Sequence, residues 1–208
     1  MSLLFDLLFP RTCAGCGRVG HYLCRDCQSK LVYQSVYQNN RLSLFRYHGA
    51  IKQLITDLKF SFVSDIVPEI GDILVYGLVN KYPHLLRYWQ QNNYILVPIP
   101  LYESRHNWRG YNQSELLCQK LSAELNLSYE PNLLVRTRNT IPQTSIRDRR
   151  LRKTNINSSF SFRSDLLNSV KLLNFIIVDD VYTTGSTIHS AASAFPRGSN
   201  LWALTIAG

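Results

Sequence analysis

The stretch FIIVDDVYTTGST, residues Phe175–Thr187, decides the fold class of this 208-residue chain. Its first four residues are apolar, as in a strand that is buried on both faces of a parallel sheet. Two adjacent carboxylates, Asp179 and Asp180, follow this run, and a loop of hydroxyls around Gly185 comes next. In open α/β sheets, ligands bind at the carboxyl ends of the strands. We therefore expect the acids and hydroxyls to form a ligand site on the crest of a sheet.

Apolar strands and helical patterns alternate along the rest of the chain. Strands are predicted at residues 42–47, 94–100, 132–137, 172–181 and 201–208, with a short edge element at residues 160–162. Helices are predicted from residue 49 onward and at residues 63–82, 112–126 and 186–195, and the second of these stops at Pro83. This alternation indicates an α/β fold in which helices flank a parallel sheet.

The loop after the two acids offers hydrogen-bond donors to a phosphate. The hydroxyls of Thr183, Thr184, Ser186 and Thr187, with backbone amides at a helix N-terminus, would form a concave seat for a phosphate monoester, and Gly185 would allow close approach. The carboxylates would repel that phosphate, so we expect them to accept hydrogen bonds from sugar hydroxyls or to act through Mg²⁺. The pattern indicates a ribose-5-phosphate cradle. A plain helix cap explains only one or two of these polar residues, and a metal site without sugar is the other alternative.

Four cysteines near the start of the chain predict a metal site. Cys13, Cys16, Cys24 and Cys27 form two C-x-x-C pairs separated by seven residues. Two such knuckles complete the tetrahedral sulfur shell that zinc prefers, and four thiolates leave no open coordination position for catalysis. We expect a structural zinc, with His21 as an ordinary surface residue.

The charge of the chain favours a polyanionic partner, because its formal net charge is +9 and its pI is near 9.5. The basic residues are concentrated between residues 134 and 163, which is also compatible with a solvated loop. The candidate DNA-binding residues in this segment are Arg147, Arg149, Arg150, Arg152 and Lys153. Some aromatic residues would suit base stacking, although each alone is more typical of a core. They are Trp108, Tyr111, Phe160 and Phe162.

No apolar run approaches the roughly 20 residues that a transmembrane helix needs. The start, MSLLFDLLFP, lacks the basic region and the cleavage site of a signal peptide. We therefore expect a cytoplasmic protein without a transmembrane segment.

The stretch FIIVDDVYTTGST resembles the phosphoribosyl pyrophosphate signature of type I phosphoribosyltransferases, although Tyr182 is bulkier than the usual aliphatic residue. Over nearly its whole length, the chain resembles ComF-type competence proteins, which are phosphoribosyltransferase-like proteins involved in the uptake of transforming DNA. The other stretches that carry this resemblance are LLFPRTCAGCG, YHGAIKQLITDLKF, VPIPLYESRHNWRGYNQSELL and IPQTSIRDRRLRKTNINSSF.

The resemblance implies a type I phosphoribosyltransferase-like parallel sheet flanked by helices, residues 36–208, and a small N-terminal zinc-knuckle module, residues 1–35. It assigns ribose contacts and any catalytic role to Asp179 and Asp180, and the 5-phosphate to the loop at residues 183–187. Arg105 and Arg109 would bind pyrophosphate. Gln143 and residues 147–150 match a mobile loop that closes over the site.

Two functions follow from the resemblance and the residues. The first is a competence protein for natural transformation that binds single-stranded DNA during uptake and carries a site for phosphoribosyl pyrophosphate with Mg²⁺. Its implied protein partner is a DNA-translocating helicase or a recombination loader. The alternative is an active phosphoribosyltransferase that acts on an unidentified nitrogen nucleophile in nucleotide metabolism. No segment indicates a base-specific pocket, so catalysis is left open.

Overall fold

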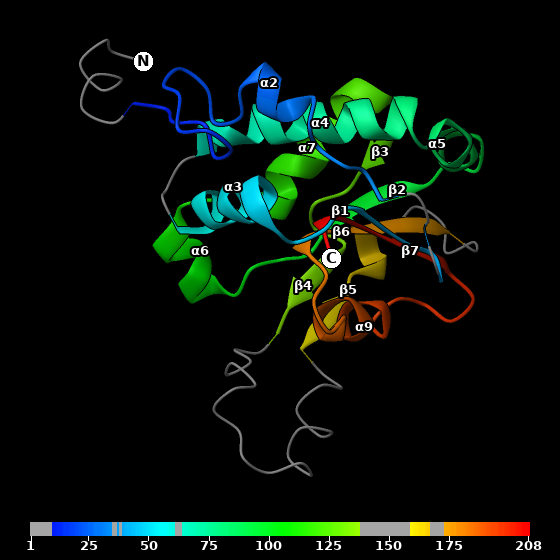
Figure 1. The fold of residues 1–208 in the computed structure, drawn as a ribbon. Coiled ribbons are helices and arrows are strands. Elements are labelled where there is room, and N and C mark those ends of the chain that lie inside the picture. The colour runs from blue at the N-terminus through cyan, green and yellow to red at the C-terminus, as the bar shows by residue number, and fades with distance from the viewer. Residues whose placement is uncertain (1–9, 35–36, 38, 61–63, 138–158, 167–172) are drawn as a thin grey trace.

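A computed structural model describes residues 10–34, 37, 39–60, 64–137, 159–166 and 173–208. At its centre is a five-stranded sheet with the order β1-β7-β6-β2-β3 in which all neighbours are parallel (Figure 1). The strands are β1 Arg41–Phe45, β2 Ile95–Pro98, β3 Ser128–Tyr129, β6 Asn174–Val181 and β7 Asn200–Ala207. The predicted parallel sheet with flanking helices is confirmed.

The strand expected at residues 132–137 has a different place from the other predicted strands. It is β4, Leu134–Arg136, and it pairs antiparallel with β5, Phe160–Phe162, in a separate two-stranded sheet. The edge position beside β2 belongs instead to the short strand β3.

Helices cover the two faces of the sheet unequally (Figure 1). One face carries α3 Gly49–Phe60, α4 Val67–Asn80, α5 Pro83–Gln91 and α7 Gln113–Leu125, whereas the other carries α9 Ser186–Ala192 with the β4–β5 pair. The remaining helices are the short α2 Arg25–Gln28 and α6 Glu103–Arg109, with 3-10 turns η1 Ser64–Ile66 and η3 Ser164–Leu166. Within the described residues, no helix is both long and apolar enough to cross a bilayer.

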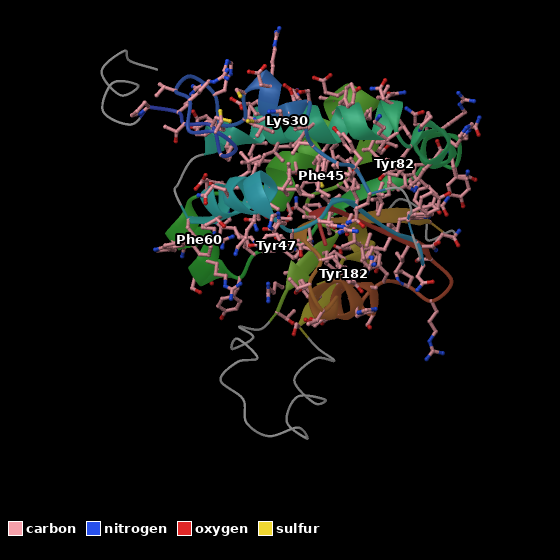
Figure 2. The ribbon with its side chains drawn as sticks, in the orientation of Figure 1. Lys30, Phe45, Tyr47, Phe60, Tyr82 and Tyr182 are labelled. Carbon is pink, nitrogen blue, oxygen red and sulfur yellow. The ribbon has the colours of Figure 1, made fainter. Side chains whose placement is uncertain are left out.

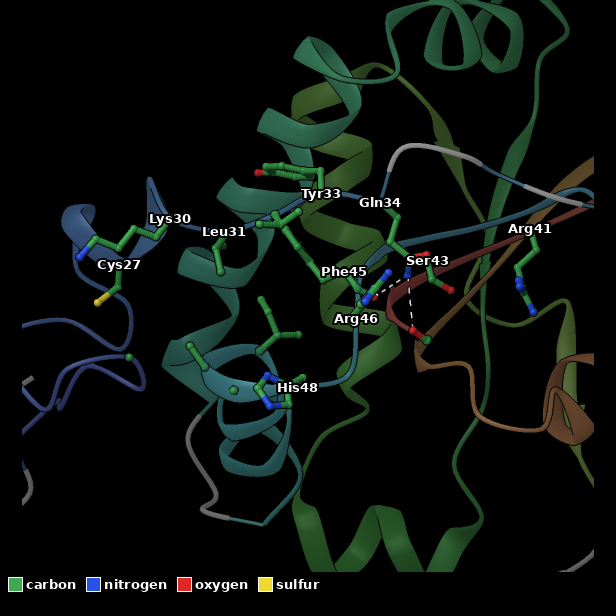
Figure 3. A pocket seen from close by; sticks show the side chains of 16 residues that line it. Cys27, Lys30, Leu31, Tyr33, Gln34, Arg41, Ser43, Phe45, Arg46 and His48 are labelled. Atoms are coloured by element: carbon green, nitrogen blue, oxygen red, sulfur yellow. Dashed lines mark hydrogen bonds between the residues drawn. The ribbon is translucent and has the colours of Figure 1, made fainter.

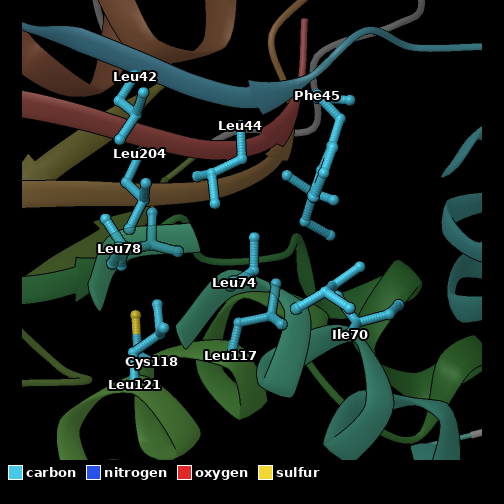
Figure 4. Close-up of a cluster of buried hydrophobic side chains, with 14 of the residues drawn as sticks. Leu42, Leu44, Phe45, Ile70, Leu74, Leu78, Leu117, Cys118, Leu121 and Leu204 are labelled. Atoms are coloured by element: carbon cyan, nitrogen blue, oxygen red, sulfur yellow. The ribbon is translucent and has the colours of Figure 1, made fainter. Parts of the chain in front are cut away.

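Side chains of β6 alternate between two hydrophobic clusters. Ile176 and Val178 belong to the larger cluster under α3, α4 and α7, part of which Figure 4 shows, and Phe175 and Ile177 belong to the smaller cluster under α9. Because successive side chains of a strand point to opposite faces, the alternation continues into the two acids. Asp180 therefore faces the α3 and α7 side, and Asp179 faces the α9 side.

The order of strands creates a switch point beside these acids. From β2 the chain passes through α6 and α7 to β3 at one edge, and from β6 it passes through α9 to β7 on the other side. The two connections diverge between β2 and β6, where ligands bind in open α/β sheets. Pro98, the last residue of β2, pairs with Val178 of β6. Asp179 and Asp180 therefore come directly after the end of the paired region of these two strands.

The cysteine segment packs onto the helices. Cys13, Leu23 and Cys24 are buried in the larger cluster with residues of α3 and α4. Glu69 of α4 accepts hydrogen bonds from the backbone N–H groups of Tyr22 at 3.2 Å and Leu23 at 2.7 Å. The boundary predicted between residues 35 and 36 lies outside the described residues.

Three helices in the described part of the chain lie outside the predicted ones: the short α2, α5 and α6. The predicted second helix is α4, which ends at Asn80, before Pro83, and Pro83 begins α5, in which Leu85, Leu86 and Trp89 are buried. Proline is well tolerated in the first helical turn, where its missing N–H group costs no hydrogen bond. Helix α6 is short and mostly exposed, so it has little apolar periodicity.

Candidate functional site

Asp180 is an internally paired carboxylate. Only 4% of the residue is exposed, and its Oδ1 atom lies 2.8 Å from Lys59 Nζ at the end of α3. Its Oδ2 atom accepts a hydrogen bond of 2.9 Å from Gln113 Nε2 at the start of α7. Since both oxygens are engaged, Asp180 joins β6 to two helices.

Arg109 extends this network away from the strand. Its Nη1 donates to Gln113 Oε1 at 3.0 Å, and its guanidinium lies 5.4 Å from the centre of the Phe60 ring. Burial lowers the pKa of Arg109, and the negative charge of Asp180 partly offsets this. The guanidinium therefore fixes the amide of Gln113 so that its N–H₂ group faces Asp180. Arg105, the other predicted pyrophosphate ligand, is exposed on α6.

Asp179 has the more open carboxylate of the pair. Its Oδ1 atom accepts hydrogen bonds from Ser114 Oγ at 3.3 Å and from the Asp180 N–H at 2.9 Å. Burial and the neighbouring Asp180 charge raise the pKa of Asp179 to about 7, against the opposing effect of Lys59. Burial lowers the pKa of Arg136 in β4, and the charge of Arg105 lowers it further. The charge of Asp179 partly offsets this. This carboxyl group can therefore exchange a proton near neutral pH.

The start of α7 supplies two of these contacts because of its cap. Asn112 accepts a hydrogen bond from the Ser114 N–H at 3.1 Å and donates from its amide to the Ile99 carbonyl at 3.1 Å. Such a cap begins the helix at a fixed residue. It places Gln113 and Ser114 in the first turn, beside the end of β6.

The hydroxyl loop follows the acids and packs on Tyr182. Thr183 and Thr184 are exposed, and Thr184 Oγ1 donates to Ser186 Oγ at 3.1 Å. Gly185 has φ of 75°, and a Cβ atom there would collide with the hydroxyl of Tyr182, so this position requires glycine. Figure 2 shows Tyr182 beside α9, and the Arg41 guanidinium lies 4.0 Å from the centre of its ring.

In the structure the acids stand near the end of β6 and the hydroxyl loop follows the strand, and side chains that the sequence did not indicate contact the acids. These are Lys59, Gln113 and Ser114. The asparagine cap signals the start of α7, but nothing local signals the contacts across the crest. Gln143 and the predicted DNA-binding residues, Arg147 to Lys153, lie outside the described residues.

Most of the aromatic residues considered for base stacking have structural contacts. Phe160 is buried, Phe162 packs against Phe175 and Phe195, and the Tyr111 hydroxyl donates to the Leu58 carbonyl at 2.7 Å. Trp108 is 52% exposed, and its ring lies edge-on to that of Phe60, with the ring centres 6.1 Å apart.

The four cysteines lie together at the N-terminal end of the described chain. Their sulfur atoms are all within 4.8 Å of one another, and Cys16 Sγ lies 3.7 Å from Cys24 Sγ. A tetrahedral zinc with Zn–S bonds of about 2.3 Å requires sulfur atoms about 3.8 Å apart. The donor set therefore fits zinc.

Backbone contacts around Cys13 suit a thiolate. Burial opposes ionisation of Cys13, but the backbone amides of Cys24, Gly15 and Cys16 outweigh it and lower the pKa of Cys13 to about 6. A Cβ atom at Gly15 would lie 2.7 Å from Cys27 Sγ, so only glycine fits there without a shift. His21 is exposed and lies outside the cluster, with Nδ1 3.9 Å from Glu69 Oε1.

The parallel sheet with helices on both faces places this protein in the class of open α/β proteins, and its polar crest lies at the switch point, where ligands bind in such sheets. The chain is 37% identical over 152 residues to DNA utilization protein YhgH of Escherichia coli strain K12. It is 30% identical over 184 residues to competence protein ComFC of Bacillus subtilis strain 168, and 30% identical over 192 residues to competence protein F of Haemophilus influenzae strain Rd. The chain belongs to the ComF family of competence proteins.

These matches cover most of the chain but not all of each relative. The match to YhgH covers 73% of this chain and 63% of the relative, so it leaves more than a third of that protein unmatched. The shares are 86% and 69% for ComFC, and 85% and 80% for competence protein F. No protein-family model matches the chain. Among solved structures, adenine phosphoribosyltransferase of Leishmania tarentolae is 14% identical, with a TM-score of 0.42 over 83% of this chain and 78% of the other.

Proposed function

We propose that this protein acts in DNA uptake, that it binds single-stranded DNA, and that its crest binds phosphoribosyl pyrophosphate with Mg²⁺. The names of the relatives support the role in DNA uptake. The observation that supports this ligand is the position of Asp179 near the carboxyl end of β6, at the switch point, with the loop at residues 183–187 following directly after the strand. Residues 1–35 then serve as a zinc-binding module attached to the ligand domain, residues 36–208.

The two acids have different roles in this proposal. Asp179, which is the more open, would accept hydrogen bonds from ribose hydroxyls, and the exposed hydroxyls of Thr183 and Thr184 would hold the 5-phosphate. Asp180 would hold the site together, because Lys59 and Gln113 already engage both of its oxygens.

Positive charge near the crest suits the pyrophosphate end of the ligand. The exposed Arg105 lies close enough to Arg109 and Arg136 to lower the pKa of both. Arg109 is buried and bonded to Gln113, so Arg105 is the better candidate for direct contact. Mg²⁺ would bind mainly to the phosphates of the ligand, since Mg²⁺ commonly takes one or two carboxylates and several phosphate or water oxygens. It would neutralise the charge of a departing pyrophosphate.

Phosphoribosyl transfer is the second candidate function, and the raised pKa of Asp179 favours it. A carboxyl group with a pKa of about 7 can take a proton from an attacking nitrogen at neutral pH, as a general base does. Pyrophosphate release in the presence of a panel of nucleobases and amines tests this activity.

Ligand-induced stabilisation tests the site. Phosphoribosyl pyrophosphate with Mg²⁺ should raise the Tm of the wild type, since a ligand at 100 times its Kd stabilises by about 2.7 kcal/mol. Asp179→Asn and a Thr183→Val, Thr184→Val variant should fold but lose most of this shift. Asp180 is a poor probe, because its removal would leave Lys59 without its ion-pair partner and so disturb the fold. An equal shift in all three proteins would rule out the crest as the binding site.

Single-stranded DNA binding is tested separately by its dependence on salt. Affinity should fall steeply between low and physiological salt, and replacing Arg149, Arg150 and Arg152 with alanine should reduce that dependence. Absence of measurable affinity at low salt would remove the DNA-binding part of the proposal. The helicase or recombination loader proposed as a partner would be sought by co-purification.

A further inference from the structure

A groove of about 1180 Å³ lies between the four-cysteine module and the sheet (Figure 3). It is formed by Gly15 and Cys27 of the module, residues 30–34 of the link to β1, β1 itself, and the beginning of α3. Small-molecule pockets usually measure about 300–1,000 Å³. The groove is slightly larger than this range, so it has room for a segment of a polymer.

The groove is lined by positive charge. Three cationic side chains, Lys30, Arg41 and Arg46, line it together with His48, and the described lining residues include no aspartate or glutamate. Figure 3 shows Lys30 on one side, Arg46 and His48 in the middle, and Arg41 on the other side. Lys30 and Arg46 are exposed, and neither forms an ion pair with any residue in the described part of the chain. Both can therefore bind an anion without breaking an internal contact.

Apolar side chains lie between these cations. Leu31 and Val32 line the groove, and 81% of Val32 is exposed. Tyr33 also lines it, and its hydroxyl is fixed by donation to the Ile73 carbonyl at 2.9 Å. A duplex hides the faces of its bases within the stack, whereas a single strand presents both phosphates and base faces. The mixed lining therefore favours an unpaired strand over a duplex.

We infer that this groove binds the backbone of single-stranded nucleic acid, with Lys30 and Arg46 contacting its phosphates. The inference rests on the proposed role in DNA handling and adds a binding site made of residues other than the proposed ligand residues of the crest and the predicted DNA-binding residues. Arg41 lines the same groove while its guanidinium stacks on Tyr182 beside the hydroxyl loop. Because its replacement would also disturb that loop, Arg41 is kept unchanged in the test.

The test compares two variants that lose the same charge. Lys30→Ala, Arg46→Ala removes two cations from the groove, and Lys81→Ala, Arg87→Ala removes two exposed cations that do not line it. Binding of a fluorescent oligothymidylate is followed by anisotropy over a range of salt concentrations. The groove variant should bind about ten-fold more weakly at low salt, and its log–log salt slope should decrease in magnitude by about 1.4, since each phosphate contact on a single strand contributes about 0.7. The control variant should bind nearly as the wild type does.

The outcomes separate this inference from the proposed function. If the wild type binds the oligonucleotide but the two variants weaken equally, only net charge matters and the groove is not the site. If polyglutamate displaces the oligonucleotide at lower concentration than unlabelled oligothymidylate does, the groove prefers an acidic polypeptide and the inference is wrong. If the wild type fails to bind at low salt, single-strand binding fails as a whole, whereas the crest is still tested by its own ligand.

Discussion

Lys59 Nζ lies 2.8 Å from Asp180 Oδ1, and this ion pair joins the end of α3 to the end of β6. Because of this contact, the two acids have different surroundings although they are adjacent in the sequence. Asp180 is enclosed and paired, whereas Asp179 points to the other face and is more accessible. A ligand at the crest would meet one more accessible carboxyl group, that of Asp179, and one that supports the site, that of Asp180.

Removing the charge of Lys59 should destabilise the fold. Lys59→Met keeps most of the apolar stem but leaves Asp180 buried without its cation, and breaking such a pair costs about 3–5 kcal/mol when fully buried. Because 23% of the Lys59 side chain is exposed, we expect about 2–3 kcal/mol. Urea denaturation measures this change.

The matched control is Lys52→Met, which removes an exposed lysine from the same helix. A further Asp180→Asn substitution in the Lys59→Met protein should recover part of the loss, because the buried charge is gone. If Lys59→Met and Lys52→Met are equally stable, the ion pair contributes nothing measurable.

Asp179 should make stability fall as pH rises. Its pKa is about 7 in the folded protein against an ordinary value of 3.8, so between these values the folded state holds a proton that the unfolded state has lost. The contribution of Asp179 to the free energy of unfolding is therefore fully present below about pH 4 and is lost as pH rises from 4 to 7. With solvent access taken into account, we expect a change of about 1–3 kcal/mol.

Asp179→Asn should abolish this part of the pH dependence. Its free energy of unfolding, measured between pH 4 and 8, should exceed that of the wild type increasingly toward neutral pH. Parallel curves for the two proteins would contradict the raised pKa.

The crest was predictable from sequence because its signal is local. An apolar strand, two acids and a hydroxyl loop are consecutive, and the alternation of strands and helices places them at the end of a parallel sheet. The partners of the acids were not predictable, since Gln113 and Lys59 reach Asp180 only through the packing of α7 and α3. Likewise, β4 has the composition of a sheet strand, and only its pairing with β5 shows that it leaves the main sheet.

Zinc removal should weaken the fold beyond the cysteine segment. Cys13 and Cys24 are buried in the same cluster as residues of α3 and α4, so chelation should lower the Tm of the whole protein. Metal analysis should find about one zinc per chain in the wild type and much less in Gly15→Ala, whose added methyl would press on Cys27 Sγ. Cys118→Ala, which changes a buried cysteine outside the cluster, should retain the metal. Full zinc content in Gly15→Ala would show that the site tolerates a side chain there.

Glu69 should hold the cysteine segment on α4. Its Oε1 and Oε2 atoms accept the N–H groups of Tyr22 and Leu23, and hydrogen bonds to a charged group contribute about 1.5–3 kcal/mol each. Glu69→Gln keeps the shape but leaves only one good acceptor, so amide hydrogen exchange at Tyr22 and Leu23 should accelerate, while amides within β6 and β7 should change little. Glu124→Gln, an exposed acid on α7, is the control and should leave these amides protected. Unchanged protection in Glu69→Gln would mean that burial of Leu23, and not the carboxylate, fixes the segment.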